Sequence, residues 1–309
     1  MIALIAALLS PAELRMPETL KPIAKTQLAA IDELSGITPH GTMPGWYWVH
    51  NDSGDQPRLF CINTRGDVAF KGWENRKADA GQSADAKPYE GIKIHGAVNQ
   101  DWEDITRIGD TLYISDLGNN DNYRRDLAVY AVKEPNPLAA REAFVLERIT
   151  VHYPEQRSFP PTIGDWEYDC EAIFAHRGKL HFLTKVRAAN TKAPVARTVL
   201  YRLDRAVPGQ SNALKRVTAL DGLGGWVTGA DASPDGKTLA ILTHVPRSLV
   251  WFVDLTQPER IWNETKWSTG AFTAGQCEAV TFENATNVLV TNEPGELFRV
   301  PVPARLKAR

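Results

Sequence analysis

The sequence predicts an all-β protein and, within that class, a β-propeller. Short runs of β-branched and aromatic residues alternate with turn residues along the chain, and no long stretch has the periodicity of an amphipathic helix. A set of about four such runs recurs roughly every 50 to 70 residues, as in propeller blades. An acidic residue stands near the start of each set. These observations predict five four-stranded blades in one ring.

The first two repeats are separated by a polar segment. The first repeat has predicted strands at residues 34–37, 46–50, 58–63 and 67–70. The polar segment, residues 73–90, is typical of an inserted surface loop, and residues 91–95 resume the outer strand. The second repeat has predicted strands at residues 103–108, 111–115, 127–132 and 148–153. A sixth blade within the polar segment is the alternative, although no strand pattern supports it.

The last three repeats predict how the ring closes. The third repeat has predicted strands at residues 171–175, 179–184, 198–203 and 214–220. The fourth has them at residues 231–233, 238–243, 249–255 and near 260–267. The fifth has only three, at residues 278–282, 287–291 and 296–300, whereas residues 23–30 form a spare strand. We therefore expect the N-terminal strand to complete the last blade, which leaves only short edges exposed.

Composition narrows the class of partner. The chain has 309 residues, a formal charge of −2 and a pI near 6.4, so neither nucleic acid nor an anionic membrane surface is an expected partner. Three cysteines cannot form a disulfide framework, and we expect all three to be reduced. We expect residues 21–305 to form a single propeller domain and the protein to be a monomer.

The N-terminal residues 1–20 are expected to be a signal-like or flexible segment. Residues 1–9 are almost wholly apolar, which is too short to span a bilayer, and Ser10-Pro11-Ala12 follows. The segment is similar to the apolar region and cleavage zone of a signal peptide that lacks its basic start. A periplasmic or secreted location is therefore expected, and a frayed apolar N-terminus is the alternative.

The repeated acidic residues predict a cation site. They are Glu33, Glu103, Glu171, Asp231 and Glu278. Because first strands line the channel of a propeller, the five carboxylates should form a ring at one mouth, where they repel one another unless some are protonated or a cation neutralises them. Oxygen ligands alone favour Ca²⁺. Alternatively, each acid accepts hydrogen bonds from backbone amides of the neighbouring blade.

The second strands should end at the same mouth and supply the remaining chemistry. Their ends are acidic or amide in three repeats and basic in the other two. A cation flanked by basic side chains can hold a phosphate or carboxylate. We expect the substrate-binding residues to be Asn51, Asn119, Lys185, Arg187, Arg247 and Asn292. The candidate proton-transfer residues are His244, Asp52 and Asp116.

Several phrases carry a resemblance to a known family. Asn51-Asp52-Ser53-Gly54-Asp55, Asp101-Trp102-Glu103-Asp104 and Asp169-Cys170-Glu171-Ala172 resemble motifs of a large, mostly uncharacterised family of exported bacterial β-propellers. The acid ring is more remotely similar to that of the calcium-activated nucleotidases, and the phytase and gluconolactonase/paraoxonase types share the use of calcium. The resemblance implies a Ca²⁺-binding propeller and leaves the activity open.

Three functions are compatible with these features. The first is a Ca²⁺-dependent hydrolase of a small anionic ester, either a phosphoester or a lactone. The second is a non-catalytic propeller that holds a structural Ca²⁺ and binds a ligand or partner. The third is a glycan-active propeller, which the equivalent positions of the five acids disfavour because that chemistry needs two differentiated carboxyls. No G-x-S-x-G motif supports an elbow serine.

Overall fold

The chain is built from β-strands, as predicted. The computed structural model describes residues 12–14, 16–70, 89–189, 191–260 and 266–303. Within these residues the helical structure is confined to one 3-10 turn, η2 (Pro258–Arg260). None of the described helical structure is long and apolar enough to cross a membrane.

The first two groups of strands form one continuous sheet. The first group contains β3 (Leu34–Pro39), β4 (Trp46–Asn51), β5 (Arg58–Asn63) and β6 (Val68–Ala69). The second contains β8 (Trp102–Ile108), β9 (Thr111–Asp116), β10 (Ala128–Lys133) and β11 (Glu142–His152). Between them, β7 (Ile92–His95) pairs antiparallel with β5 and parallel with β11. The resumed outer strand therefore bridges two groups.

Three further sheets follow along the chain. The third group contains β12 (Trp166–His176), β13 (Lys179–Arg187), β14 (Pro194–Val195), β15 (Arg197–Leu203) and β17 (Lys215–Asp221), and the short β16 (Asn212–Ala213) pairs with β11. The fourth contains β18 (Trp226–Ala232), β19 (Thr238–His244), β20 (Ser248–Asp254) and β21 (Lys266–Thr269). The fifth contains β22 (Cys277–Asn284), β23 (Asn287–Asn292) and β24 (Glu296–Pro301).

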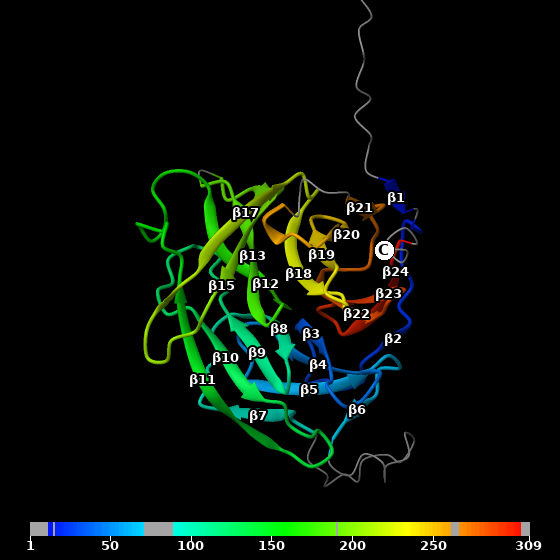
Figure 1. Ribbon diagram of the computed structural model, residues 1–309. Coiled ribbons are helices and arrows are strands. Elements are labelled where there is room, and N and C mark those ends of the chain that lie inside the picture. The colour runs from blue at the N-terminus through cyan, green and yellow to red at the C-terminus, as the bar shows by residue number, and fades with distance from the viewer. Residues whose placement is uncertain (1–11, 15, 71–88, 190, 261–265, 304–309) are drawn as a thin grey trace, which may run out of the picture.

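The first strands of the five groups close into a ring. In chain order β3, β8, β12, β18 and β22 each contact the next, and β22 contacts β3. Figure 1 shows these strands around the centre of the molecule, with the later strands of each group farther out. Sheets that run outward from a closed ring of first strands make the fold a β-propeller.

The N-terminal segment is paired with two of the sheets. Strand β2 (Ala24–Lys25) pairs antiparallel with β24 and is the fourth strand of the fifth group. Strand β1 (Ala12–Leu14) pairs parallel with β21, and Leu20 N donates a hydrogen bond to Thr273 O at 3.0 Å. The N-terminal strands β1 and β2 therefore lie beside the fourth and fifth groups, which contain the last described strands of the chain.

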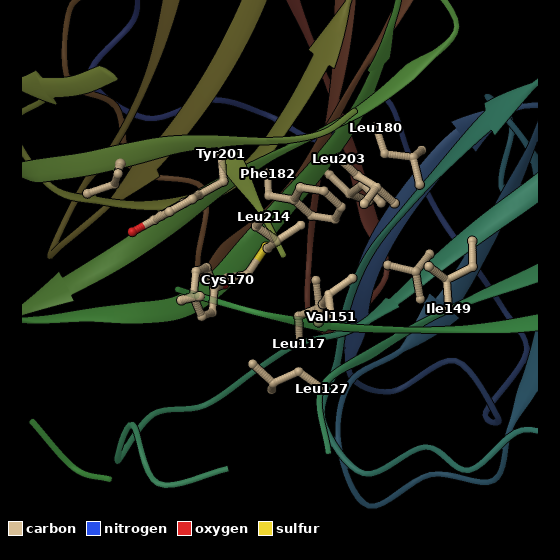
Figure 2. Packing of buried hydrophobic residues seen from close by; sticks show 14 residues of the cluster. Leu117, Leu127, Ile149, Val151, Cys170, Leu180, Phe182, Tyr201, Leu203 and Leu214 are labelled. Carbon is tan, nitrogen blue, oxygen red and sulfur yellow. The ribbon is translucent and has the colours of Figure 1, made fainter. Parts of the chain in front are cut away.

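Apolar side chains fill the spaces between neighbouring sheets. Figure 2 shows one such cluster, in which Leu117, Val151 and Cys170 lie close to Phe182 and Tyr201 between the second and third groups. Inner strands are buried on both faces and read as continuous apolar runs, as in β10, whereas the outer strand β11 alternates between buried and exposed positions. All three cysteines are free and buried.

Three predicted strands begin clearly earlier in the structure, at Glu142 for β11, Trp166 for β12 and Trp226 for β18. Residues 231–233 were expected to begin the fourth group, but β18 begins at Trp226 and ends at Ala232. Gly229 hides this start because it interrupts the apolar pattern. A Cβ at Gly229 would lie 2.8 Å from Glu278 O of β22, so the approach of the two first strands requires glycine there. The proposed sixth blade at residues 73–90 lies almost wholly outside the described residues.

Candidate functional site at the channel mouth

A β-bulge near the start of every first strand selects the side chains that reach the mouth. At this point the pairing with the second strand shifts by one residue in all five groups of strands. The bulge positions are Ser35, Glu103, Glu171, Thr228 and Glu278. Bulges re-aim side chains and are common beside active sites. In the strand register, three glutamates, one serine and one threonine therefore occupy equivalent positions in the five groups.

Two of the five acids expected in the ring lie elsewhere. Glu33 lies two residues before the bulge position of its strand and is exposed. Asp231 lies three residues after the bulge of β18, and its Oδ2 accepts hydrogen bonds from Thr281 Oγ1 (2.8 Å) and Phe282 N (2.9 Å) of the next sheet. Asp231 therefore has the alternative role considered for these acids, which is to link neighbouring sheets.

The two hydroxyl residues at the bulge positions also link sheets. Ser35 Oγ donates to Glu103 O at 2.7 Å, and Thr228 Oγ1 donates to Cys277 O at 2.9 Å. Of the five bulge residues, the serine and the threonine therefore link neighbouring groups of strands, and the three glutamates place carboxylates at the mouth. Only the carboxylates remain for ligand chemistry.

A cavity of about 410 Å³ lies at this mouth. Its lining includes four carboxylates, those of Asp52, Glu103, Glu171 and Glu278. It also includes the basic and aromatic side chains of Lys185, Arg187, Trp226 and His244. Asn120, Thr228, Val245, Pro246 and Gln276 complete the lining. The predicted mouth therefore brings together seven of the predicted site residues: Asp52, Glu103, Glu171, Lys185, Arg187, His244 and Glu278.

The carboxylates converge in two overlapping groups. Asp52, Asp101 and Glu103 form the first, and Glu103, Asp169 and Glu171 form the second. Within each group one oxygen from every member lies within 4.8 Å of the others. Glu103 belongs to both, and its carboxylate accepts no hydrogen bond from the residues that the structure describes.

Burial and mutual repulsion shift the acidities at the mouth. Burial, followed by the charges of Glu171 and Asp52, raises the pKa of Glu103 well above its usual range. Burial likewise raises the pKa of Glu171, that of Asp101 to about 6 and that of Glu278 to about 7. A group of carboxylates that resists ionisation in this way favours a bound cation.

Lys185 is held by the acids opposite it. Its Nζ lies 2.5 Å from Glu171 Oε1 and 3.8 Å from Asp169 Oδ2. Burial alone would lower the pKa of Lys185, but the carboxylates of Glu171, Asp169 and Glu103 raise it above its usual value. Lys185 was expected to bind substrate, and in the structure its closest partner is a carboxylate of the protein.

Arg187 and Trp226 form a stacked pair beside Lys185. The Arg187 guanidinium carbon lies 4.3 Å from the centroid of the Trp226 ring, and Lys185 Nζ lies 5.6 Å from it. Trp226 Nε1 donates to Val186 O at 2.8 Å, which fixes the ring, and Arg187 also donates to Asn120 Oδ1. The outer edge of the guanidinium is therefore presented on a rigid aromatic surface.

His244 is the one histidine that lines the cavity. Its Nδ1 lies 2.9 Å from Ser248 Oγ. Burial lowers its pKa, so the ring is neutral at pH 7. In the tautomer whose Nδ1 donates to Ser248, Nε2 is the atom that can accept a proton.

Asp116 and Asn119 are buried within the protein and do not line the cavity. Asp116 Oδ1 accepts hydrogen bonds from Asp101 N and Arg124 Nη2, both at 3.0 Å, and it forms a buried ion pair with this arginine. Asn119 N donates to Asp169 Oδ1 at 2.6 Å, and its Nδ2 donates to Tyr168 O. Asp116 therefore holds the backbone of Asp101 in the first carboxylate group, and Asn119 contacts the carboxylate of Asp169 in the second.

Asn51, Asn292 and Arg247 likewise lie outside the cavity lining. Asn51 Nδ2 donates to Ala30 O and to Asp32 and Asp55 carboxylates. Asn292 Nδ2 donates to Ala274 O at 2.9 Å, and Arg247 donates to Ala271 O. These bonds fix turns at the ends of the second and third strands, so the three residues are placed to support the mouth rather than to contact a ligand in it.

Sequence reasoning missed Trp226, and it did not include Asp101 and Asp169 among the predicted cation ligands. Trp226 was hidden because it precedes the strand start expected at residue 231. Asp101 and Asp169 stand directly before the repeated phrase, and this repetition was the available signal for carboxylates that join the groups at the mouth.

The first carboxylate group fits Ca²⁺. Calcium binds oxygen ligands at about 2.4 Å, so two ligands of one ion lie at most about 4.8 Å apart, and the three oxygens of Asp52, Asp101 and Glu103 satisfy this limit. The absence of a side chain at Gly118 gives the Glu103 carboxylate its space, because a Cβ there would lie 2.1 Å from Glu103 Oε1.

Comparison with known proteins gives the fold alone. No family model matches the chain, and no curated protein matches it in sequence. The chain is similar to a chain in the crystal structure of the mitotic checkpoint complex, with 10% identity over 98% of this chain and 99% of that one. It is also similar to the β-propeller domain of Myceliophteria thermophila Cps50 (Swd1), with 7% identity over 88% and 97% of the two chains. Both have a TM-score of 0.40. The assignment of the fold as a propeller is based on the strand order and ring contacts described above.

Proposed function

We propose that this protein is a five-bladed, Ca²⁺-dependent propeller that hydrolyses a small anionic ester, either a phosphoester or a lactone, at its channel mouth. The observation that carries the proposal is the convergence of Asp52, Asp101 and Glu103 beside a cavity that basic side chains also line. The strand β2, paired with β24, would close the fifth blade. The resemblance to exported bacterial propellers supports the Ca²⁺-binding part of the proposal and leaves the activity open.

The first group has the features of a cation site. Its members contribute only oxygen atoms, and Glu103, which is 6% exposed, has no hydrogen-bond donor among the described residues. Removing a carboxylate from water without a partner is costly, so a resident cation explains why the chain keeps Glu103 there. Extracellular modules bind Ca²⁺ with Kd values of about 10⁻⁴–10⁻³ M, a range that suits the exported location predicted from the N-terminus.

The chain's own residues supply the remaining functions. Arg187, held over the Trp226 ring, would bind an anionic group of the substrate in the cavity. His244 Nε2 would accept the proton of the attacking water, and its bond to Ser248 would keep the ring oriented. A Ca²⁺ ion, when bound, would polarise the substrate oxygen or acidify a water.

Two measurements on purified protein test the proposal. Hydrolysis of p-nitrophenyl phosphate and of simple lactones is assayed with Ca²⁺ and with a chelator, and thermal unfolding is followed under the same conditions. We expect Ca²⁺ to raise the Tm and to be required for hydrolysis, and Glu103→Gln to weaken both effects. Stabilisation by Ca²⁺ without hydrolysis would indicate the non-catalytic, ligand-binding function instead.

A further inference from the structure

The ammonium of Lys185 lies beside two members of a group of three carboxylates. Glu103, Asp169 and Glu171 form the second carboxylate group, and Lys185 Nζ lies 2.5 Å from Glu171 Oε1 and 3.8 Å from Asp169 Oδ2. Only 11% of the lysine side chain is exposed. The protein therefore carries its own cation at this position.

Lys185 only partly satisfies these acids. Asp169 is fully buried, and its Oδ1 accepts a hydrogen bond from Asn119 N, but its Oδ2 has no hydrogen-bond partner. The nearest cationic atoms are Lys185 Nζ and Arg187 Nε at 3.8 and 3.9 Å, beyond hydrogen-bond distance. Asp169 Oδ2 is thus a buried carboxylate oxygen beside the ammonium but not bonded to it. This indicates that the position suits a cation that binds more oxygen ligands than one ammonium does.

Glu103 connects this position to the first group. Since it is a member of both groups, two cations bound to them would share its carboxylate. Paired metal ions in hydrolytic sites lie about 3.5–4 Å apart. An ammonium in place of one ion supplies one positive charge where Ca²⁺ supplies two, and it contacts fewer oxygen atoms.

We propose that Lys185 Nζ occupies the second position of a two-cation site, so that the protein binds one Ca²⁺ at Asp52, Asp101 and Glu103 and excludes a second. The proposal rests on the first cation site of the proposed function. It makes Lys185 the residue that sets cation stoichiometry, and it does not require hydrolysis.

Calcium titration of three variants tests this role. Wild-type protein, Lys185→Met and the control Lys179→Met are stripped with chelator, and bound Ca²⁺ is counted by calorimetry and elemental analysis. Lys179 lies on the same strand, pairs with Asp204 and does not line the cavity. We expect one ion per chain in wild type and Lys179→Met and two in Lys185→Met. Lys185→Met that binds one ion with wild-type affinity overturns the proposal. Wild-type protein that binds none overturns the proposed function instead, whatever the variants do.

A second variant decides the case in which Lys185→Met fails to fold. Glu171→Gln keeps Lys185 and removes its closest partner but leaves the first group intact. One bound ion with affinity within about threefold of wild type supports the assignment of the first group as the Ca²⁺ site. Loss of the ion would place Ca²⁺ in the second group and overturn the role given to Lys185.

Discussion

Replacing Gly118 with alanine perturbs the cation site with little effect on the rest of the fold. A Cβ at Gly118 would lie 2.1 Å from Glu103 Oε1 and 2.4 Å from Asp101 Cγ, so something has to move. The backbone is held in place because Gly118 N donates to Asp101 O at 3.2 Å and Gly118 O accepts from Arg124 Nη1 at 2.8 Å. The two carboxylates, which are the ends of side chains, must therefore shift.

The expected magnitudes separate stability from ion binding. Overpacking a site costs about 1–3 kcal/mol, and we expect the lower end because only side-chain ends move. Two of three proposed ligands leave their positions, however, and misplaced ligands reduce metal affinity by about 10- to 100-fold. Gly118→Ala should therefore lose Ca²⁺ affinity while the metal-free protein remains folded.

Calorimetric Ca²⁺ titration and thermal unfolding measure both quantities. Gly41→Ala is the matched control, because a Cβ there would lie 2.5 Å from Glu134 Oε2, a carboxylate that does not line the cavity. We expect the control to lower the Tm slightly and to leave Ca²⁺ affinity unchanged. Gly118→Ala with wild-type affinity would show that Glu103 and Asp101 do not hold the ion.

Three further predictions concern other parts of the molecule. Burial raises the pKa of Asp231 from 3.8 to about 6, so the folded state binds a proton that the unfolded state has lost, and wild-type stability falls as the pH rises from about 4 to 6. At about 1.4 kcal/mol per pH unit, the stability of Asp231→Asn relative to wild type should increase by about 3 kcal/mol over this range, as measured by denaturant unfolding. A stability difference that does not change with pH would contradict this. Arg124→Met breaks the buried pair with Asp116 and should cost about 3–5 kcal/mol in the same assay, whereas a cost below about 1 kcal/mol would mean that the pair is not important. His244→Gln should lower hydrolysis by about 10²–10⁴-fold with Ca²⁺ affinity unchanged, and unaltered hydrolysis would exclude His244 as the base.

The propeller was predictable because each sheet repeats the same physical requirements. Strands buried on both faces read as short apolar runs, and turns between them require glycine, proline and aspartate. The spare N-terminal strand and the missing fourth strand of the last sheet were also visible, and β2 pairs with β24. The length of β11 was harder to predict from the sequence, because an outer strand with one exposed face has a weaker hydrophobic pattern.

The site was only partly predictable because the bulges shift the register. Glu103, Glu171 and Glu278 share a bulge position, but Ser35 and Thr228 occupy it in the other two sheets, and nothing in their chemistry marks them as equivalent to glutamate. A search for repeated acids therefore selects the nearest carboxylate in the sequence. Such a search has no means of detecting a one-residue change in strand pairing.

The charges at the mouth imply that cation and anion binding depend on each other. Among the cavity-lining residues, the carboxylates of Asp52, Glu103, Glu171 and Glu278 face only two permanently cationic side chains, Lys185 and Arg187, and Lys185 is already engaged by Glu171. When these four carboxylates are ionised, an anion that approaches Lys185 and Arg187 meets net negative potential until a cation is bound. Under the proposed function, Ca²⁺ therefore increases the affinity for the anionic ester, and by linkage the ester must increase the affinity for Ca²⁺ by the same factor.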